Sequence, residues 1–137
     1  MPNVKYSNVT EYLFANLPSI RVYYEARSAE LYAGNNPHVI FGSILVDYAN
    51  EIYKNLVASI YIENDNLLKD IFSVLENLSA SSDFETRCLM ETTVLEGLLG
   101  EDGGLERFAR YMGPETKKLA RSLAEDWGLN TDILGKS

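Results

Sequence analysis

The sequence predicts an all-α fold, a single antiparallel bundle of about six to seven helices. Apolar residues recur at spacings of three and four over most of the chain, which is typical of amphipathic helices. No segment alternates with the period of two that marks a half-buried strand, and the hairpin dipeptide Asn-Gly is absent. Glycine, proline and asparagine separate the apolar stretches at short intervals, so successive helices are expected to pack as antiparallel neighbours.

The expected helices follow one another in the order that these breaks dictate. Pro18 separates the first two, and Asn36 before Pro37 is a typical helix start, an N-cap followed by proline at the first helical position. The later helix boundaries are marked by four stretches: the polar ENDN and SASSD, the glycine-rich GEDGG, and a Gly-Pro dipeptide. The helices predicted in this way cover approximately residues 10–17, 19–32, 37–59, 65–78, 84–99, 105–112 and 114–127.

The chain is long enough for one domain with a sizeable core, because it has 137 residues of which 46% are hydrophobic. We expect residues 1–128 to form that single helical domain and residues 129–137 to form a C-terminal tail. The fourth and fifth helices are expected to stack as a helical-repeat-like unit. No apolar run approaches the roughly 18–20 residues of a membrane span, and the N-terminus carries no recognisable signal peptide.

Residues that could carry catalysis or bind a metal are scarce. The chain has one histidine, His38, and one cysteine, Cys88, so a zinc site of the usual composition cannot be assembled from it. No serine stands in a nucleophile-elbow setting. The stretch GLLGEDGG lacks the Gly-Lys-Ser/Thr of a phosphate-binding loop, and its own acids would repel phosphate. We therefore expect no catalytic residues, metal ions or cofactors, and a single thiol fits a reducing cytoplasm.

The negative charge of the chain is concentrated in one region. The net charge is −8, and residues 61–106 contain 11 acidic and 2 basic side chains. Such a charge disfavours nucleic acid and anionic membrane surfaces as partners, because both repel it. It favours a basic protein partner, or it serves solubility alone.

The helix expected over residues 84–99 carries a glutamate on its apolar face. At about 100° per residue, Glu91 falls inside the apolar stripe, while Glu85 and Glu96 fall together on one side of it. Arg87 precedes Glu91 by four residues, and we expect an ion pair to support this partly buried carboxylate. If the edge of the stripe is open, Glu91 instead meets a cation of a partner. The apolar residues of the stripe are Phe84, Cys88, Leu95, Leu98 and Leu99.

The acids of this region and two tyrosines are the candidate partner-binding residues. The chain contains nine tyrosines, which suit interfaces because the ring packs while the hydroxyl stays in contact with water. The alternative for the acids is an ordinary solvated face. The candidates are Glu85, Glu91, Glu96, Glu101, Asp102 and Glu106, with Tyr53 and Tyr61 as aromatic residues at the rim.

The segment LLKDIFSVLENLSASSDFETRCLMETTVLEGLLG, followed by LERFARYMGPETKKLARSLAEDWG, resembles a known family. It is similar to the small helical immunity proteins of bacterial contact-dependent growth inhibition and other polymorphic toxin systems. The shared features are a helix with a leucine pair and acids, a polar turn, and a helix ending like VLEGLLG. A tyrosine-glycine-proline-like turn and a helix ending in tryptophan follow. The similarity covers about residues 67–127.

The resemblance implies a cytoplasmic protein that binds and neutralises one cognate toxin C-terminal domain. Such toxins are often nucleases with basic substrate grooves, which an acidic surface can plug by imitating phosphate. Two other functions stay open. One is a helical adaptor or regulatory module with another protein partner. The other is an enzyme or small-molecule site at Glu91, which a deep pocket with a second carboxylate would favour.

Overall fold

The computed structural model describes residues 3–31, 36–58, 62–100 and 102–135, and it confirms an all-α bundle with seven continuous α-helical segments and no strand in these ranges. A π-helical turn, Ile40–Leu45, joins α3 to α4, and a second, Met90–Leu95, joins α6 to α7. The labelled helices are α1 (Val9–Asn16), α2 (Pro18–Leu31), α3 (Pro37–Val39), α4 (Val46–Ala58), α5 (Ile62–Ser79), α6 (Phe84–Leu89), α7 (Glu96–Leu99), α8 (Gly104–Phe108) and α9 (Pro114–Asp126).

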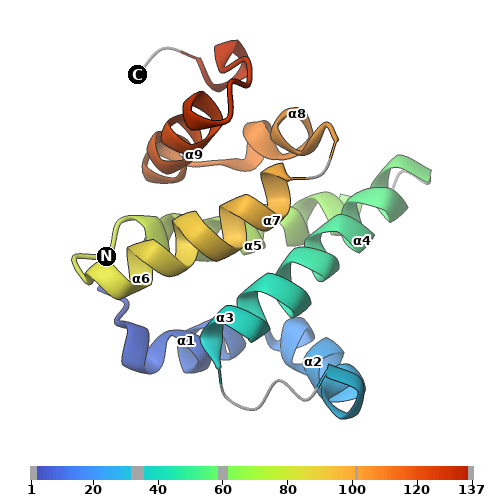
Figure 1. Cartoon of the computed structure of the whole chain (residues 1–137). Coiled ribbons are helices and arrows are strands. Elements are labelled where there is room, and N and C mark those ends of the chain that lie inside the picture. The colour runs from blue at the N-terminus through green and yellow to red at the C-terminus, as the bar shows by residue number, and fades with distance from the viewer. Residues whose placement is uncertain (1–2, 32–35, 59–61, 101, 136–137) are drawn as a thin grey trace.

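The helices form three layers, which Figure 1 shows one above another. α1 and α2 lie at the bottom, α5 and α6–α7 form the middle, and α8 and α9 lie at the top, while α3–α4 runs obliquely from the level of α1 up to the right of the middle layer. Phe41, Phe72 and Phe108 are fully buried in a common core. The rings of Phe72 and Phe108 stack with their centroids 5.6 Å apart, so the core ties the middle layer to the top one.

The helices α3–α4 and α6–α7 pack closely because glycine stands at their contact. A β-carbon at Gly42 would lie 3.0 Å from Cγ2 of Thr93, and one at Gly97 would lie 3.0 Å from Cγ2 of Val46. Both distances are shorter than an ordinary van der Waals contact, so the close approach depends on the missing side chains. At the same contact, Nδ1 of His38 lies 2.5 Å from the hydroxyl oxygen of Thr93.

The two π turns lie against each other at this contact. A π turn is usually a single insertion into an α-helix. One extra residue rotates the side chains that follow it by roughly 100° relative to those before it. The spacing of buried residues shows the shift. Leu89 and Met90 are fully buried, and the next fully buried residues, Val94 and Leu95, each follow five positions later in the sequence.

The π turn corrects the core face predicted for residues 84–99. An uninterrupted α-helix places Phe84 and Cys88 in line with Leu95, but Phe84 is 69% exposed and Cys88 is half-buried. Glu91 lies within the π turn itself and is half-buried. The predicted core face was therefore wrong for the first half of this helix. The apolar residues before an insertion keep their own regular spacing, so the sequence gives no sign that the core face shifts. The fully buried residues there are Thr86, Leu89 and Met90.

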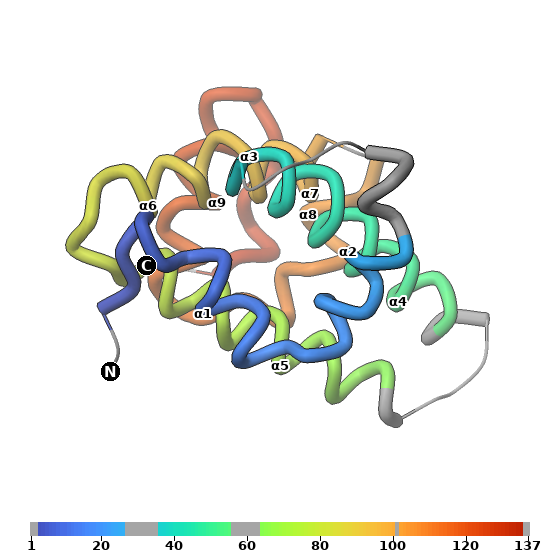
Figure 2. Tube along the Cα trace, turned by 90° about the horizontal axis from the view of Figure 1, so that it is seen from below, coloured from blue at the N-terminus to red at the C-terminus, as the bar shows by residue number. Residues whose placement is uncertain are grey.

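The N-terminal segment is fastened to the turn between α5 and α6, as Figure 2 shows. Asp83 caps α6 by accepting a hydrogen bond from the amide of Glu85, and it accepts another at 2.6 Å from the amide of Tyr6. The bond from Tyr6 holds the pKa of the Asp83 carboxyl below its usual range. The side-chain oxygen of Asn3 accepts a hydrogen bond at 2.9 Å from the amide of Ser82.

A glutamate of α5 anchors the start of α9. The carboxylate of Glu76 accepts hydrogen bonds from the amides of Glu115 and Thr116, at 2.8 and 2.9 Å, and from the Thr116 hydroxyl at 2.9 Å. It thereby satisfies amide groups that a helix N-terminus leaves without partners. A β-carbon at Gly113 would lie 2.5 Å from the carboxyl carbon of Glu76, so a larger residue there would displace this carboxylate.

The segment expected to form a C-terminal tail packs in part against the bundle. Leu134, in the short 3-10 helix Asp132–Leu134, is buried in the core cluster. The guanidinium of Arg121 on α9 donates a hydrogen bond to the backbone carbonyl of Gly135. These contacts hold the chain beyond α9 close to the top layer.

If the π turn Met90–Leu95 contains an inserted residue, deleting the exposed Thr92 should convert it into a regular α-helix with the core face in register. We expect this deletion variant to keep its helical circular dichroism and to unfold cooperatively in urea. Deletion of the exposed Lys69 in regular α5 is the control, and it should abolish cooperative unfolding because it rotates half of the core face. Equal damage from both deletions would contradict the insertion.

Removal of the Glu76 carboxylate should loosen α9. We expect Glu76→Ala to lower the free energy of unfolding by about 1–2 kcal/mol, the usual effect of losing a helix cap, and Glu76→Gln to have a smaller effect. Urea denaturation measures both. Asp70→Ala, at an exposed position of the same helix, is the matched control. A Glu76→Ala variant as stable as this control would show that the anchor has no energetic role.

Candidate functional site

Five of the six acidic candidates lie in the described part of the chain, along the surface of α6, α7 and the turn into α8. Glu85 is in the first turn of α6, Glu91 in the π turn and Glu96 at the start of α7. Asp102 precedes α8, and Glu106 lies within its first turn. Glu91 is half-buried and the other four are exposed.

None of these five carboxylates forms an ion pair with another described residue. Other acids of the same charged region are used inside the fold. Asp65 is ion-paired, Glu76 anchors α9 and Asp83 caps α6. The region therefore contains two kinds of acid: those that stabilise the bundle and those that have no ion-pair partner among the described residues.

The exposed acids extend along the helix instead of forming one compact cluster. At 1.5 Å per residue, the helix over residues 84–99 is roughly 24 Å long, with Glu85 near one end and Asp102 and Glu106 beyond the other. The π turn also rotates Glu96 away from the side on which Glu85 lies, so an ideal helix overstates how closely they align. A partner that contacts all of them must cover an extended surface.

The predicted ion pair between Arg87 and Glu91 is not formed. The guanidinium of Arg87 turns back towards the start of α6 and donates a hydrogen bond at 2.7 Å to the carbonyl of Ser81. Long side chains on a helix point towards its N-terminus, where this carbonyl lies. Glu91 is left without a described cation, which suits the second interpretation, an open edge that a partner can reach.

The candidate tyrosines contribute less to an open surface than the acids do. Tyr53 is half-buried, with its ring centroid 5.8 Å from that of Phe108 and the guanidinium carbon of Arg107 lying 5.2 Å from its centre. It packs mainly against the protein itself. Tyr61 and the sixth acidic candidate, Glu101, lie outside the described residues.

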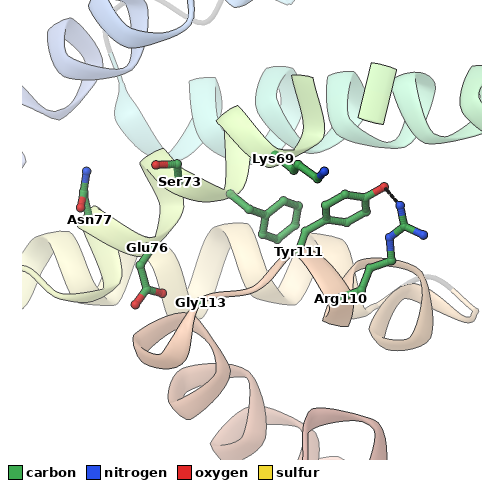
Figure 3. Close-up of a pocket in the computed structure, with 8 residues that line it drawn as sticks. Lys69, Ser73, Glu76, Asn77, Arg110, Tyr111 and Gly113 are labelled. Atoms are coloured by element: carbon green, nitrogen blue, oxygen red, sulfur yellow. Dashed lines mark hydrogen bonds between the residues drawn. The ribbon is translucent and has the colours of Figure 1, made fainter. Parts of the chain in front are cut away.

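A surface pocket that the sequence did not reveal lies between α5 and the connection from α8 to α9 (Figure 3). Its volume is about 440 Å³. Lys69 and Arg110 lie near one end and Glu76 further along α5, with Tyr111 beside Arg110. Phe72 stacks against Tyr111, with ring centroids 5.9 Å apart. The residues come from segments about 40 positions apart, which is why no motif in the sequence marks the pocket.

Asp65 organises the charges beside this pocket. It accepts hydrogen bonds from the Tyr111 hydroxyl at 2.7 Å and from the Arg110 guanidinium at 2.5 Å, and Lys69 pairs with it at 3.0 Å. These partners, with the Tyr111 hydrogen bond first among them, lower the pKa of Asp65 to about 2. Burial, together with the hydrogen bond to Asp65, raises the pKa of Tyr111 to about 12.

The network neutralises the positive charge that this pocket could otherwise offer to an anion. Lys69 and Arg110 both pair with Asp65, and Glu76 adds a second negative charge to the lining. The neutral Tyr111 hydroxyl and the carboxylate of Asp65 already bind each other. We therefore assign the pocket a structural role, the joining of α5 to the top layer.

A second hollow lies between the α7–α8 turn and the residues that follow α9. Its volume is about 350 Å³. Trp127 and Leu129 are 43% and 41% exposed and provide its apolar wall, while Asp102 and Glu106 line it with carboxylates. We call it the Trp127 groove. Its two acids, Asp102 and Glu106, are among the candidates predicted from the sequence, while Trp127 is not.

Two other classes of site are not found in the described part of the chain. No group of three or more histidine, cysteine, aspartate or glutamate side chains there is arranged to hold a metal ion. No helix in the same ranges combines the length and the apolar character needed to cross a membrane. Glu91 lines neither the pocket at Asp65 nor the Trp127 groove.

Fold and surface together define the class of this protein: an all-helical domain in which carboxylates with no ion pair to a described residue are exposed along one helix and the turn that follows it. The chain belongs to the family described as "Domain of unknown function (DUF7674)", whose model matches residues 10–128 and so covers the bundle from α1 to the end of α9. No curated protein and no solved structure matches the chain.

The Asp65 network should make stability depend on pH in the acid range. Its pKa of about 2 lies below the ordinary value of 3.8, so its stabilising effect is complete above 3.8 and is lost as the pH falls towards 2. We expect Asp65→Asn to be less stable than the wild type near neutral pH, with a difference that disappears near pH 2. Urea denaturation at several pH values measures this, and a difference independent of pH would contradict it.

Proposed function

We propose that the protein binds a basic protein partner through the acidic surface of α6, α7 and α8, and that it is an immunity protein for a cognate bacterial toxin domain. The observation that supports this proposal is the set of five carboxylates, four of them exposed and one half-buried, that have no described ion pair. Such groups contribute little to the bundle, because unpaired like charges repel one another. When a cationic partner binds, its positive charges offset that repulsion and attract the carboxylates.

The toxin as partner follows from the resemblance of residues 67–127 to the small helical immunity proteins. In this proposal the toxin is a nuclease with a basic substrate groove, and the carboxylates take the positions that phosphates occupy in the substrate. Their spread along roughly 24 Å of helix suits an elongated groove better than a small pocket. Inhibition then requires only occlusion, and no bond is made or broken by the immunity protein.

Exposed apolar side chains beside the acids support a protein partner in particular. Phe84, which is 69% exposed, immediately precedes Glu85, and Trp127 shares its groove with Asp102 and Glu106. Protein interfaces combine aromatic residues that contribute most of the affinity with charges that steer association. Each end of the acidic surface offers such a combination.

The proposal is tested with the product of the adjacent upstream gene, where a toxin gene is expected. The two proteins should co-purify, and the association rate should fall as salt is added, because the attraction is electrostatic. We expect the double variant Glu85→Lys and Glu96→Lys to weaken binding by about tenfold or more and to flatten the salt dependence. Stopped-flow association at several salt concentrations measures both effects.

A second double variant, Glu11→Lys and Asp47→Lys, is the matched control. It changes the net charge equally at two exposed acids that are not part of the acidic surface and lie on α1 and α4. It should leave binding nearly unchanged. Equal loss in both double variants would show that only net charge matters, and no complex with the upstream product would refute the toxin as partner.

A further inference from the structure

The Trp127 groove is formed by a turn that only glycine allows. Gly103 has a positive φ of 75°, in the left-handed region. A β-carbon at Gly104 would lie 1.9 Å from the carbonyl oxygen of Leu98, so no other residue fits there without rearrangement. The tight turn brings Asp102 and Glu106 to the lining of the groove, opposite the end of α9.

The groove has an unusual apolar wall. Trp127 is the chain's only tryptophan, and 43% of it is exposed although it ends a helix whose other apolar residues are buried or half-buried. Leu129 beside it is 41% exposed. A large aromatic side chain left in water gains most when a partner covers it, and tryptophan is prominent among the residues that dominate binding energies.

No positive side chain of the described chain occupies the groove. The nearest arginine in sequence, Arg107, donates at 2.8 Å to the side-chain oxygen of Asn50 and stacks over Tyr53. Towards the turn it reaches the backbone carbonyl of Asp102, not its carboxylate. The carboxylates of Asp102 and Glu106 form no ion pair with a described residue, so they can accept hydrogen bonds from a cationic partner.

We infer that the Trp127 groove binds an arginine side chain of the basic partner, an inference that rests on the proposed function. A guanidinium is planar, so it can stack on the indole of Trp127 while its edge donates paired hydrogen bonds to a carboxylate. A lysine ammonium meets only part of this arrangement, because it is a point charge with strong hydration. Leu129 offers an apolar contact to a residue that flanks the arginine.

The inference is tested without the toxin, by tryptophan fluorescence. The probe is a short acetylated and amidated peptide of alternating leucine and arginine. Because Trp127 is the only tryptophan, the signal reports on this groove alone. We expect a saturable change with the arginine peptide, a several-fold weaker one with lysine in place of arginine, and none with glutamate. Calorimetry with a Trp127→Leu variant should show weaker binding of the arginine peptide.

Two matched variants locate the binding site. Asp102→Asn with Glu106→Gln removes the charges of the groove, and Glu85→Gln with Glu96→Gln removes two charges from the rest of the acidic surface. The first pair should reduce affinity for the arginine peptide about tenfold or more, and the second should leave the tryptophan signal nearly unchanged. Equal effects of the two pairs, or no saturable signal in the wild type, would overturn the inference.

The two proposals can fail separately. If the toxin domain binds, but Asp102→Asn with Glu106→Gln leaves its affinity unchanged, the groove is not the arginine site and the immunity function stands. If the arginine peptide binds in the groove while the product of the upstream gene forms no complex, the immunity function fails and the groove stands.

Discussion

The contact between the two long central helices determines where the rest of this bundle lies. Gly42 and Gly97 let the helices approach until each glycine meets a β-branched side chain of the other helix. The π turns of both helices lie at this contact, and the outer layers rest on them: α2 packs against the turn Ile40–Leu45 and α9 against the turn Met90–Leu95. A change in the depth of this crossing would therefore move both outer layers.

The sequence was sufficient for the number and order of the helices, but not for the face that α6 presents to the core. Asn36 and Pro37 mark the start of α3 as predicted, because capping depends on neighbours within one turn. The core face of α6 was predicted wrongly, because an inserted residue changes the register of everything before or after it. Glu91 entered the predicted core for that reason, and its half-exposed position is a consequence of the inserted turn.

The separation of structural from exposed acids was also beyond the sequence. Asp65, Glu76 and Asp83 each bind a group between about 40 and 80 positions away: Arg110, the start of α9, and Tyr6. Such distances are set by the packing of the bundle, not by local pattern. In the sequence these acids are indistinguishable from Glu85 or Glu96, which bind nothing described. The charged region as a whole could be predicted, while the roles of its members required the structure.

The distinction between acids that stabilise the fold and acids that are exposed helps to explain the function of the negative charge. Acids that cap helices or close ion pairs would be kept in any stable version of the bundle, so they say nothing about a partner. The exposed carboxylates are different, because they line one helix and a glycine-dependent turn, and each end of that surface includes an exposed aromatic ring. Solubility alone needs charge but not its association with Phe84 and Trp127, since exposed aromatic side chains work against solubility. The combination is what an interface requires: charge to guide a cationic partner and an apolar contact to hold it.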